Sequence, residues 1–114
     1  MGREAGAVTG RPASERAAAM LSHRGLGAVL EAVCREYHVT HAEVLGRSRR
    51  QSIARARHCL CWRLAHEHGL STVEIMPMVD RDKSTVWDAI EVHWQRIQRG
   101  EARAPEGVTL AGLG

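Results

Sequence analysis

The chain has 114 residues, of which 44% are hydrophobic and 4% aromatic, and a formal net charge of +3. This length suits one domain with a modest core. The absence of Phe and the single Tyr disfavour β-rich architectures. The charge is uneven, because residues 47–63 carry six Arg and no acidic residue. A basic segment on a mildly acidic remainder indicates a polyanionic partner.

The first 46 residues predict a flexible arm followed by three helices. Residues 1–13 are rich in Gly, Ala and Arg and predict the arm, after which Ser14 is expected to cap a helix through Ser22. Apolar residues at spacings of three and four predict a helix over residues 26–38. Thr40 and Glu43 form a capping box, which opens a short helix that stops near Gly46.

A long helix is expected from residue 51 to about residue 69. Its apolar face consists of Ile53, Ala56, Leu60 and Leu64. A second, donor-rich stripe consists of Gln51, Arg55, His58 and Trp62.

Two further helices are predicted after residue 70. Ser71 and Glu74 form a second capping box, which opens a short helix through Ile75 that Pro77 is expected to kink or shorten. Asp82 is the predicted N-cap of the last helix, which runs to about residue 98. Its predicted buried side consists of Val86, Ala89, Ile90, His93 and Ile97. The domain therefore spans residues 14–99, and residues 100–114 predict a flexible tail.

A short helix, a tight turn and a second helix with a polar start are typical of a helix-turn-helix. In that arrangement the first turn of the second helix enters the major groove, where Lys83, Ser84 and Thr85 would reach base edges. Asp82 would cap the helix, orient Arg81 or accept from cytosine N4. The free backbone N–H groups at the helix start also favour a phosphate.

The basic loop before the long helix predicts a second contact with the duplex. An Arg in such a loop can enter a narrow minor groove, where the negative potential is strongest. Side chains one or two turns into the following helix are expected to lie along the phosphates. The candidate residues of this second contact are Arg47, Arg49, Arg50, Arg55, Arg57 and His58.

Residues 39–97 resemble the C-terminal DNA-binding domain of the bacterial replication initiator DnaA. Glu43-Val44-Leu45 and the following residues 47–57 are similar to the family's basic loop and its Ser-(Val/Ile)-Ala-Arg-x-Arg helix start. Ser71-Thr72-Val73-Glu74-Ile75 is similar to its Ser-x-x-Glu-Ile turn of helix. Arg81-Asp82-Lys83-Ser84-Thr85-Val86 is one residue away from its Arg-Asp-His-(Ser/Thr)-Thr-Val signature. With residues 26–38 included, the resemblance covers about residues 26–98.

The resemblance implies an all-α fold, a small helical bundle with a helix-turn-helix of the Trp-repressor-like kind, that binds short duplex sites called DnaA boxes. It implies a minor-groove role for Arg49 and phosphate contacts for Arg57 and His58. It also implies that residues 82–85 read major-groove bases.

Several residues depart from the family's pattern. Lys83 replaces the signature His, so the preferred DNA sequence is expected to differ, and His58 stands where Gln is common. Further departures in the helix-turn-helix are Met76, Pro77, Asp80, Trp87 and Asp88. The 114 residues hold no G-x-x-x-x-G-K-[ST] loop, so neither an ATPase module nor a cofactor is expected.

Other functional classes find little support in the sequence. Cys59 and Cys61 lie about 200° apart around a helix and cannot converge with His66 and His68 on one metal ion. No nucleophile has an evident general base, so we do not expect an enzyme. Three Cys without a signal peptide predict reduced thiols and a cytoplasmic, nucleoid-associated protein. No apolar run reaches the roughly 18 residues of a membrane span.

We therefore expect sequence-specific binding of double-stranded DNA at sites like the DnaA box. Its use in the cell is open between competition with the initiator, transcription regulation, and service to a phage or mobile element. The alternative from another class is an adaptor that binds the initiator or its regulators, which Pro77, Asp80 and Asp88 favour. The sequence indicates no oligomeric state.

Overall fold

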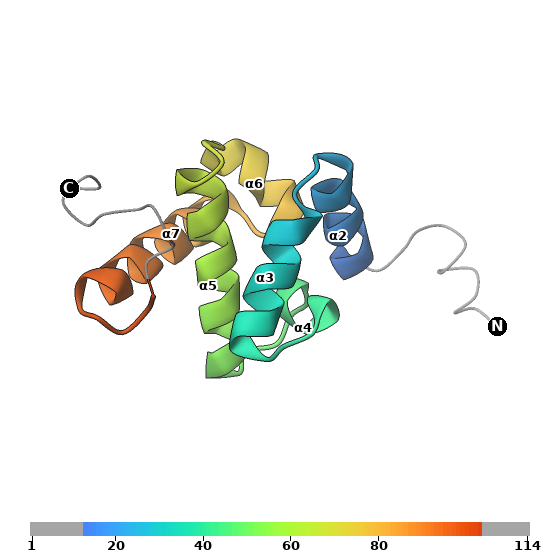
Figure 1. The fold of residues 1–114 in the computed structure, drawn as a ribbon. Coiled ribbons are helices and arrows are strands. Elements are labelled where there is room, and N and C mark those ends of the chain that lie inside the picture. Colours follow the sequence, from blue (N-terminus) through green and yellow to red (C-terminus); the bar gives the residue numbers. More distant parts are fainter. Residues whose placement is uncertain (1–12, 104–114) are drawn as a thin grey trace.

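The computed structural model describes residues 13–103, which fold into helices without any strand in that range (Figure 1). The helices are α2 (Ala13–His23), α3 (Gly27–Tyr37), α4 (His41–Leu45), α5 (Gln51–His66), α6 (Thr72–Val79) and α7 (Lys83–Gln98). The all-α prediction is thus confirmed. The predicted arm and tail fall almost entirely outside the described residues.

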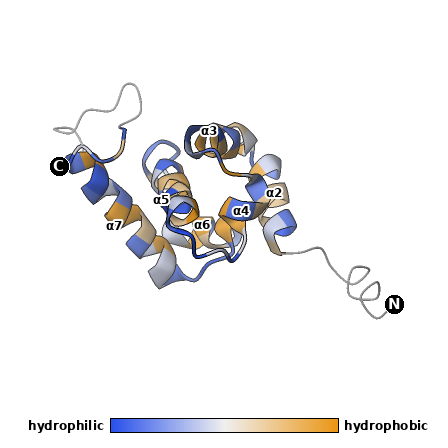
Figure 2. Cartoon of the chain, turned by 90° about the horizontal axis from the view of Figure 1, so that it is seen from below, coloured by the Kyte–Doolittle hydropathy of each residue, from blue (hydrophilic) through white to orange (hydrophobic). Residues whose placement is uncertain are grey.

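Helix α5 is the centre of the bundle and packs against α3, α4, α6 and α7. Its predicted apolar face is buried, as are both cysteines of the helix. In Figure 2 the hydrophobic residues of α4, α5 and α6 face one another in the middle of the bundle. Burial of this apolar surface is the main favourable contribution to folding.

The second stripe of α5 is only partly exposed, because α7 packs along the C-terminal half of it. Gln51 and Arg55 are on the surface, whereas His58 is half-buried and Trp62 is fully buried. Trp62 lies between His66 and His93, with ring centroids 5.1 and 5.6 Å away.

Both predicted capping boxes are present. The Thr40 hydroxyl accepts from the backbone N–H of Glu43, whose carboxylate accepts from the N–H of Thr40. Ser71 and Glu74 make the same reciprocal pair at the start of α6. The prediction for Ser14 is wrong, because α2 begins at Ala13 and Ser14 lies inside its first turn.

Helix α6 is longer than predicted. It continues through Pro77 to Val79 instead of ending at Ile75. Proline cannot donate to the carbonyl four residues earlier, which here belongs to Val73, a residue that is 62% exposed. Because residue Val73 is exposed to that extent, water can reach this turn of α6 and satisfy the carbonyl. The opposite side buries Ile75, Met78 and Val79 in the core.

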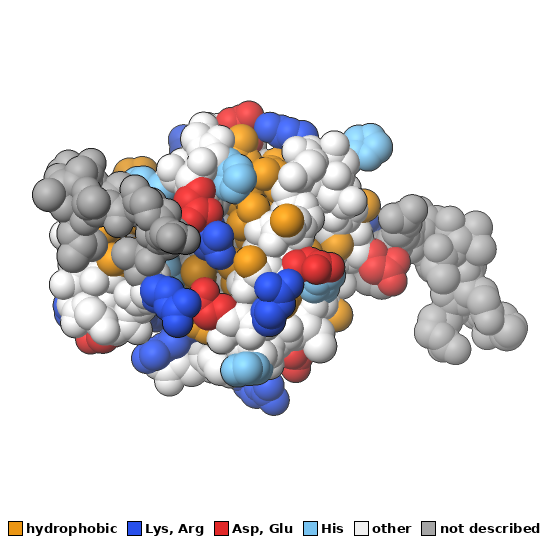
Figure 3. Space-filling model, viewed as in Figure 1, with side chains coloured by type: hydrophobic (Ala, Val, Ile, Leu, Met, Phe, Trp, Pro, Cys, Tyr) orange, Lys and Arg blue, Asp and Glu red, His pale blue; other side chains and the backbone are white. Residues whose placement is uncertain are grey.

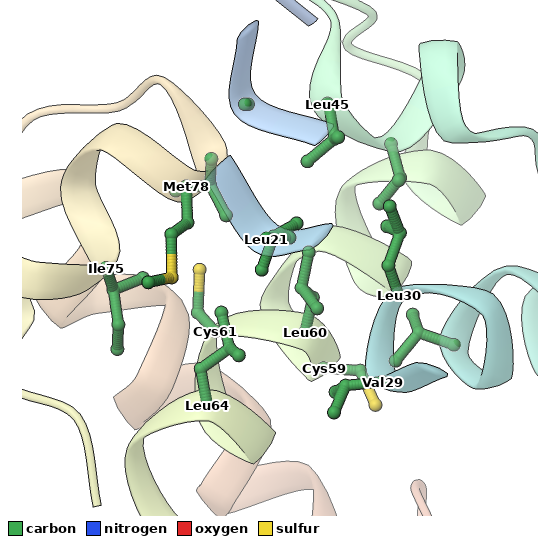
Figure 4. Packing of buried hydrophobic residues seen from close by; sticks show 14 of the residues in the cluster. Leu21, Val29, Leu30, Leu45, Cys59, Leu60, Cys61, Leu64, Ile75 and Met78 are labelled. Atoms are coloured by element: carbon green, nitrogen blue, oxygen red, sulfur yellow. The ribbon is translucent and has the colours of Figure 1, made fainter. Parts of the chain in front are cut away.

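Helix α2 belongs to the same core. It packs against α3, α4 and α6, and its Ala17 and Leu21 are buried. Figure 4 shows Leu21 among Leu45, Leu60 and Met78, side chains that come from three other helices. No helix of the described residues is long and apolar enough to cross a membrane.

Candidate nucleic-acid interface

The turn between α6 and α7 has the geometry of a helix-turn-helix. Asp80 ends α6 in the left-handed conformation, with φ of 54°, and its N–H donates to the carbonyl of Met76. Residues other than Gly seldom adopt this conformation, but Asp tolerates it better than most. Asp82 then caps α7 by accepting from the N–H of Thr85 at 2.9 Å. A hydrogen bond from the Thr85 side chain, and then the one from its backbone N–H, hold the pKa of Asp82 below its usual value.

The start of α7 presents polar side chains to solvent. Lys83, Ser84 and Thr85 are all exposed. An open groove of about 600 Å³ lies between α6 and the start of α7, and its lining includes Val73, Pro77 and Thr85. The first turn of α7 therefore stands free of the bundle, as a helix that enters a DNA groove must.

The basic loop lies beside this turn. Arg47 donates to the Asp80 carboxylate at 2.9 Å, which joins the loop after α4 to the end of α6. Arg49 and Arg50 are exposed, and Arg50 also lies 3.6 Å from the Glu43 carboxylate. The two segments that the sequence singled out, more than 30 residues apart, are neighbours in the structure.

Two of the predicted DNA-binding arginines point inward. Arg57 is only 8% exposed, and its guanidinium donates to the backbone carbonyls of Val44 at 2.8 Å and of Gly46 and Ser48 at 3.3 Å. Burial, and then the nearby Arg81, lower the pKa of Arg57 to about 10, so it remains charged at neutral pH.

Arg81 makes a similar set of bonds. Its guanidinium donates to the carbonyls of Val79 at 3.1 Å and Asp80 at 3.0 Å, and also to the carbonyl of Gly46. Burial lowers its pKa as well. Sequence reasoning could not foresee this arrangement, because an arginine at the edge of a basic motif has the same pattern whether it faces out or in.

His58 also points into the bundle. It lies under α7, where its Nδ1 accepts from the Arg96 guanidinium at 2.9 Å. Burial, followed by the charge of Arg96, lowers the pKa of His58 to about 4. His58 is therefore neutral at physiological pH and contributes no positive charge to a DNA contact.

Eight of the eleven predicted site residues are exposed on the surface. They are Arg47, Arg49, Arg50, Arg55, Asp82, Lys83, Ser84 and Thr85. On the face seen in Figure 3, over α3 and α5, basic and acidic side chains are interspersed. That face offers no continuous positive surface.

Trp87 is an exposed apolar residue of the helix-turn-helix that the predicted set of DNA-binding residues does not include. This residue, a departure from the family's pattern, is 58% exposed one turn after Lys83. It lines a surface hollow of about 500 Å³ together with Asp82, Lys83 and Ser84. The sequence carries a signal for this position of Trp87. Trp87 follows Lys83 by four residues, so both lie on one face of the helix, and it is not on the predicted buried side.

No metal centre is evident in the described part of the chain, which holds no group of three His, Cys, Asp or Glu that could bind an ion. Cys34, Cys59 and Cys61 are buried free thiols. Burial raises the pKa values of Cys59 and Cys61 to about 12, which leaves both thiols protonated.

Comparison with known proteins gives one match. No curated protein and no solved structure matches the chain. A family model described as the bacterial DnaA protein helix-turn-helix matches residues 26–92, which is more than half of the chain and includes both the basic loop and the start of α7. The C-terminal domain of DnaA that this model describes binds double-stranded DNA at DnaA boxes. The chain therefore belongs to the DnaA helix-turn-helix family.

Proposed function

We propose that this protein binds double-stranded DNA in a sequence-specific manner, at sites related to the DnaA box. One observation carries the proposal. The exposed arginines of the loop after α4 and the polar start of α7 lie side by side, joined by the Arg47–Asp80 ion pair and by the Gly46 carbonyl. A loop arginine in the minor groove and a helix in the adjacent major groove need this proximity.

The roles of the exposed residues follow from their positions. Arg49 enters the minor groove, and Arg47, Arg50 and Arg55 neutralise phosphates. Lys83, Ser84 and Thr85 contact base edges in the major groove, and Asp82 caps α7 and is placed to accept from cytosine N4. We leave Arg57, His58 and Arg81 out of this set of direct contacts, because their side chains form hydrogen bonds within the bundle.

The cellular role that we propose is regulation at the nucleoid. Such a domain would compete with the initiator for its boxes or regulate transcription beside them, and it would serve a phage or mobile element equally well. Of the three residues that favoured the adaptor alternative, Asp80 and Pro77 have a structural role within the bundle. Asp80 is paired with Arg47, and Pro77 fits on the outer side of α6. Asp88, exposed one residue after Trp87, remains in its favour.

The direct test is binding to a duplex with a DnaA box and to a scrambled duplex of equal length, at stated salt. The proposal predicts tighter binding to the box, and typical domains of this kind prefer specific sites by about 10³-fold or more. A matched control is Arg35→Ala, which removes an exposed positive charge from α3, outside the interface. Equal binding to both duplexes would refute sequence-specific recognition.

Lys83 tests the base-reading surface. An ammonium with three donors prefers guanine acceptors to a thymine methyl, so we expect a site shifted toward G where Lys83 meets it. Selection from random duplexes, run for the parent, Lys83→His and Lys83→Ala, measures this. Lys83→His should return the preference toward the family's box, and Lys83→Ala should reduce specificity more than non-specific binding. Identical selected sequences in all three would show that Lys83 reads no base.

A further inference from the structure

One backbone carbonyl, that of Gly46, accepts hydrogen bonds from two arginines on separate elements. Arg57 comes from α5 and reaches it with Nη2 at 3.3 Å, and Arg81 comes from the turn before α7. The two guanidinium groups repel each other, since each positive charge disfavours the other's. Their convergence therefore requires favourable contacts elsewhere.

Those contacts are the carbonyl groups at two helix ends. Arg57 donates to Val44 near the end of α4, and Arg81 donates to Val79 and Asp80 at the end of α6. The last carbonyls of a helix lack intrahelical partners and carry partial negative charge, so a buried cation there is stabilising. Each arginine thus caps one helix, and both meet at the same oxygen.

The shared acceptor is fixed in place. Gly46 has an ordinary negative φ of −90°, but a Cβ on it would lie 2.5 Å from the carbonyl oxygen of Ala42. A side chain at this position would displace α4 or the loop. The carbonyl of Gly46 is therefore a fixed point between the basic loop and the turn that starts α7.

We infer that Arg57 and Arg81 are positioning residues, which set the spacing between Arg49 and the first turn of α7 through the Gly46 carbonyl and do not bind phosphate. The inference rests on the proposed function. A loop and a helix held at the correct spacing bind as one rigid unit, whereas a loosened pair loses the advantage of simultaneous engagement. These two arginines then contribute to specificity without touching a base.

Arg81 offers the cleaner test, because it is less buried than Arg57. Arg81→Lys keeps the positive charge but replaces the planar fork by a single ammonium, which cannot serve three carbonyls in the same geometry. Arg81→Ala removes the charge as well. Both are compared with the parent on the duplex selected by the parent and on a scrambled duplex, over a range of salt concentrations. Thermal unfolding gives the folded fraction of each variant, by which the affinities are corrected.

Positioning predicts that both variants lose affinity for the selected duplex on the order of tenfold or more, with little change on the scrambled duplex. The salt slope of Arg81→Ala should equal that of the parent. A phosphate contact predicts instead that Lys rescues binding and that Ala reduces the salt slope by about one. Rescue by Lys, a reduced slope, or equal losses on both duplexes would each overturn the positioning role.

A second comparison measures the coupling directly. If Arg81 holds the loop and α7 at a fixed spacing, Arg49→Ala should cost less affinity in the Arg81→Lys background than in the parent. Equal losses in both backgrounds would overturn the inference. A parent that binds selected and scrambled duplexes equally refutes the proposed function and the positioning role together, whereas a discriminating parent matched by Arg81→Lys refutes only the positioning role.

Discussion

Acid should destabilise this fold well above the pH at which carboxylates titrate, because His93 is buried in its neutral form. The side chain is 1% exposed between α5 and α7, and its Nδ1 has no hydrogen-bond partner within the described part of the chain. Burial, and then the charge of Arg96, that of His58 when it is protonated in acid, and that of Arg63, lower the pKa of His93 to about 4. The unfolded chain binds the proton more tightly, with an ordinary His pKa near 6.5.

The direction of the effect follows from that difference. A group whose pKa is lower in the folded state stabilises the fold above its unfolded pKa, and this contribution is lost as the pH falls toward the folded pKa. For His93 the window is from about pH 6.5 to about pH 4. Between pH 8 and pH 5 the loss for this residue is about 2 kcal/mol. His58, whose pKa is also about 4, contributes in the same direction.

The assay is urea unfolding at a series of pH values from 8 to 5. The parent is compared with His93→Leu, which removes the titrating group, and with the control His68→Leu, which removes an exposed histidine. The free energy of unfolding should fall less steeply with acid in His93→Leu than in the parent or the control. Parallel pH dependence in all three proteins would refute the assignment of acid sensitivity to His93.

Three further predictions concern DNA binding. Arg49→Ala should weaken binding to the selected duplex by about 1–3 kcal/mol, most strongly with A/T-rich flanks, and a loss no larger than that of Arg35→Ala would exclude Arg49 from the minor groove. The logarithm of the binding constant should fall against the logarithm of the salt concentration with a slope of about −4 to −5, as expected when the exposed cations Arg47, Arg49, Arg50, Arg55 and Lys83 each displace a counterion; a flat response would favour the adaptor function. Trp87, exposed beside Lys83, should change its fluorescence when duplex is added, and the change should disappear in Trp87→Leu. An unchanged emission at saturation would place Trp87 outside the interface.

Apart from the Ser14 cap, the features that depend on neighbouring residues could be predicted from the sequence. Both capping boxes and the Asp82 cap use partners three residues apart, and all three are confirmed. The apolar face of α5 follows from its period and is also confirmed. The helix-turn-helix follows from the order of these local signals.

Features that depend on residues distant in the sequence could not be predicted from it. The acceptor of Arg81 at Gly46 is 35 residues away, so no local pattern distinguishes it from an arginine that contacts DNA. Trp62 is buried because α7 crosses over it. Pro77 does not end α6, since the buried side of the helix outweighs one missing hydrogen bond on the outer side.

Helix α2 lies outside the part of the chain that matches the family, but it is part of the hydrophobic core. The family match begins at residue 26, after α2 has ended, yet Leu21 fills the space behind α4 and α6. A transplant of the helix-turn-helix cut at the family boundary would expose that apolar surface to water. Losing a fully buried Leu side chain to a cavity typically costs 2–5 kcal/mol, a large part of the stability of a small domain. A chimaera that borrows this DNA-binding surface must therefore carry residues 13–25 with it.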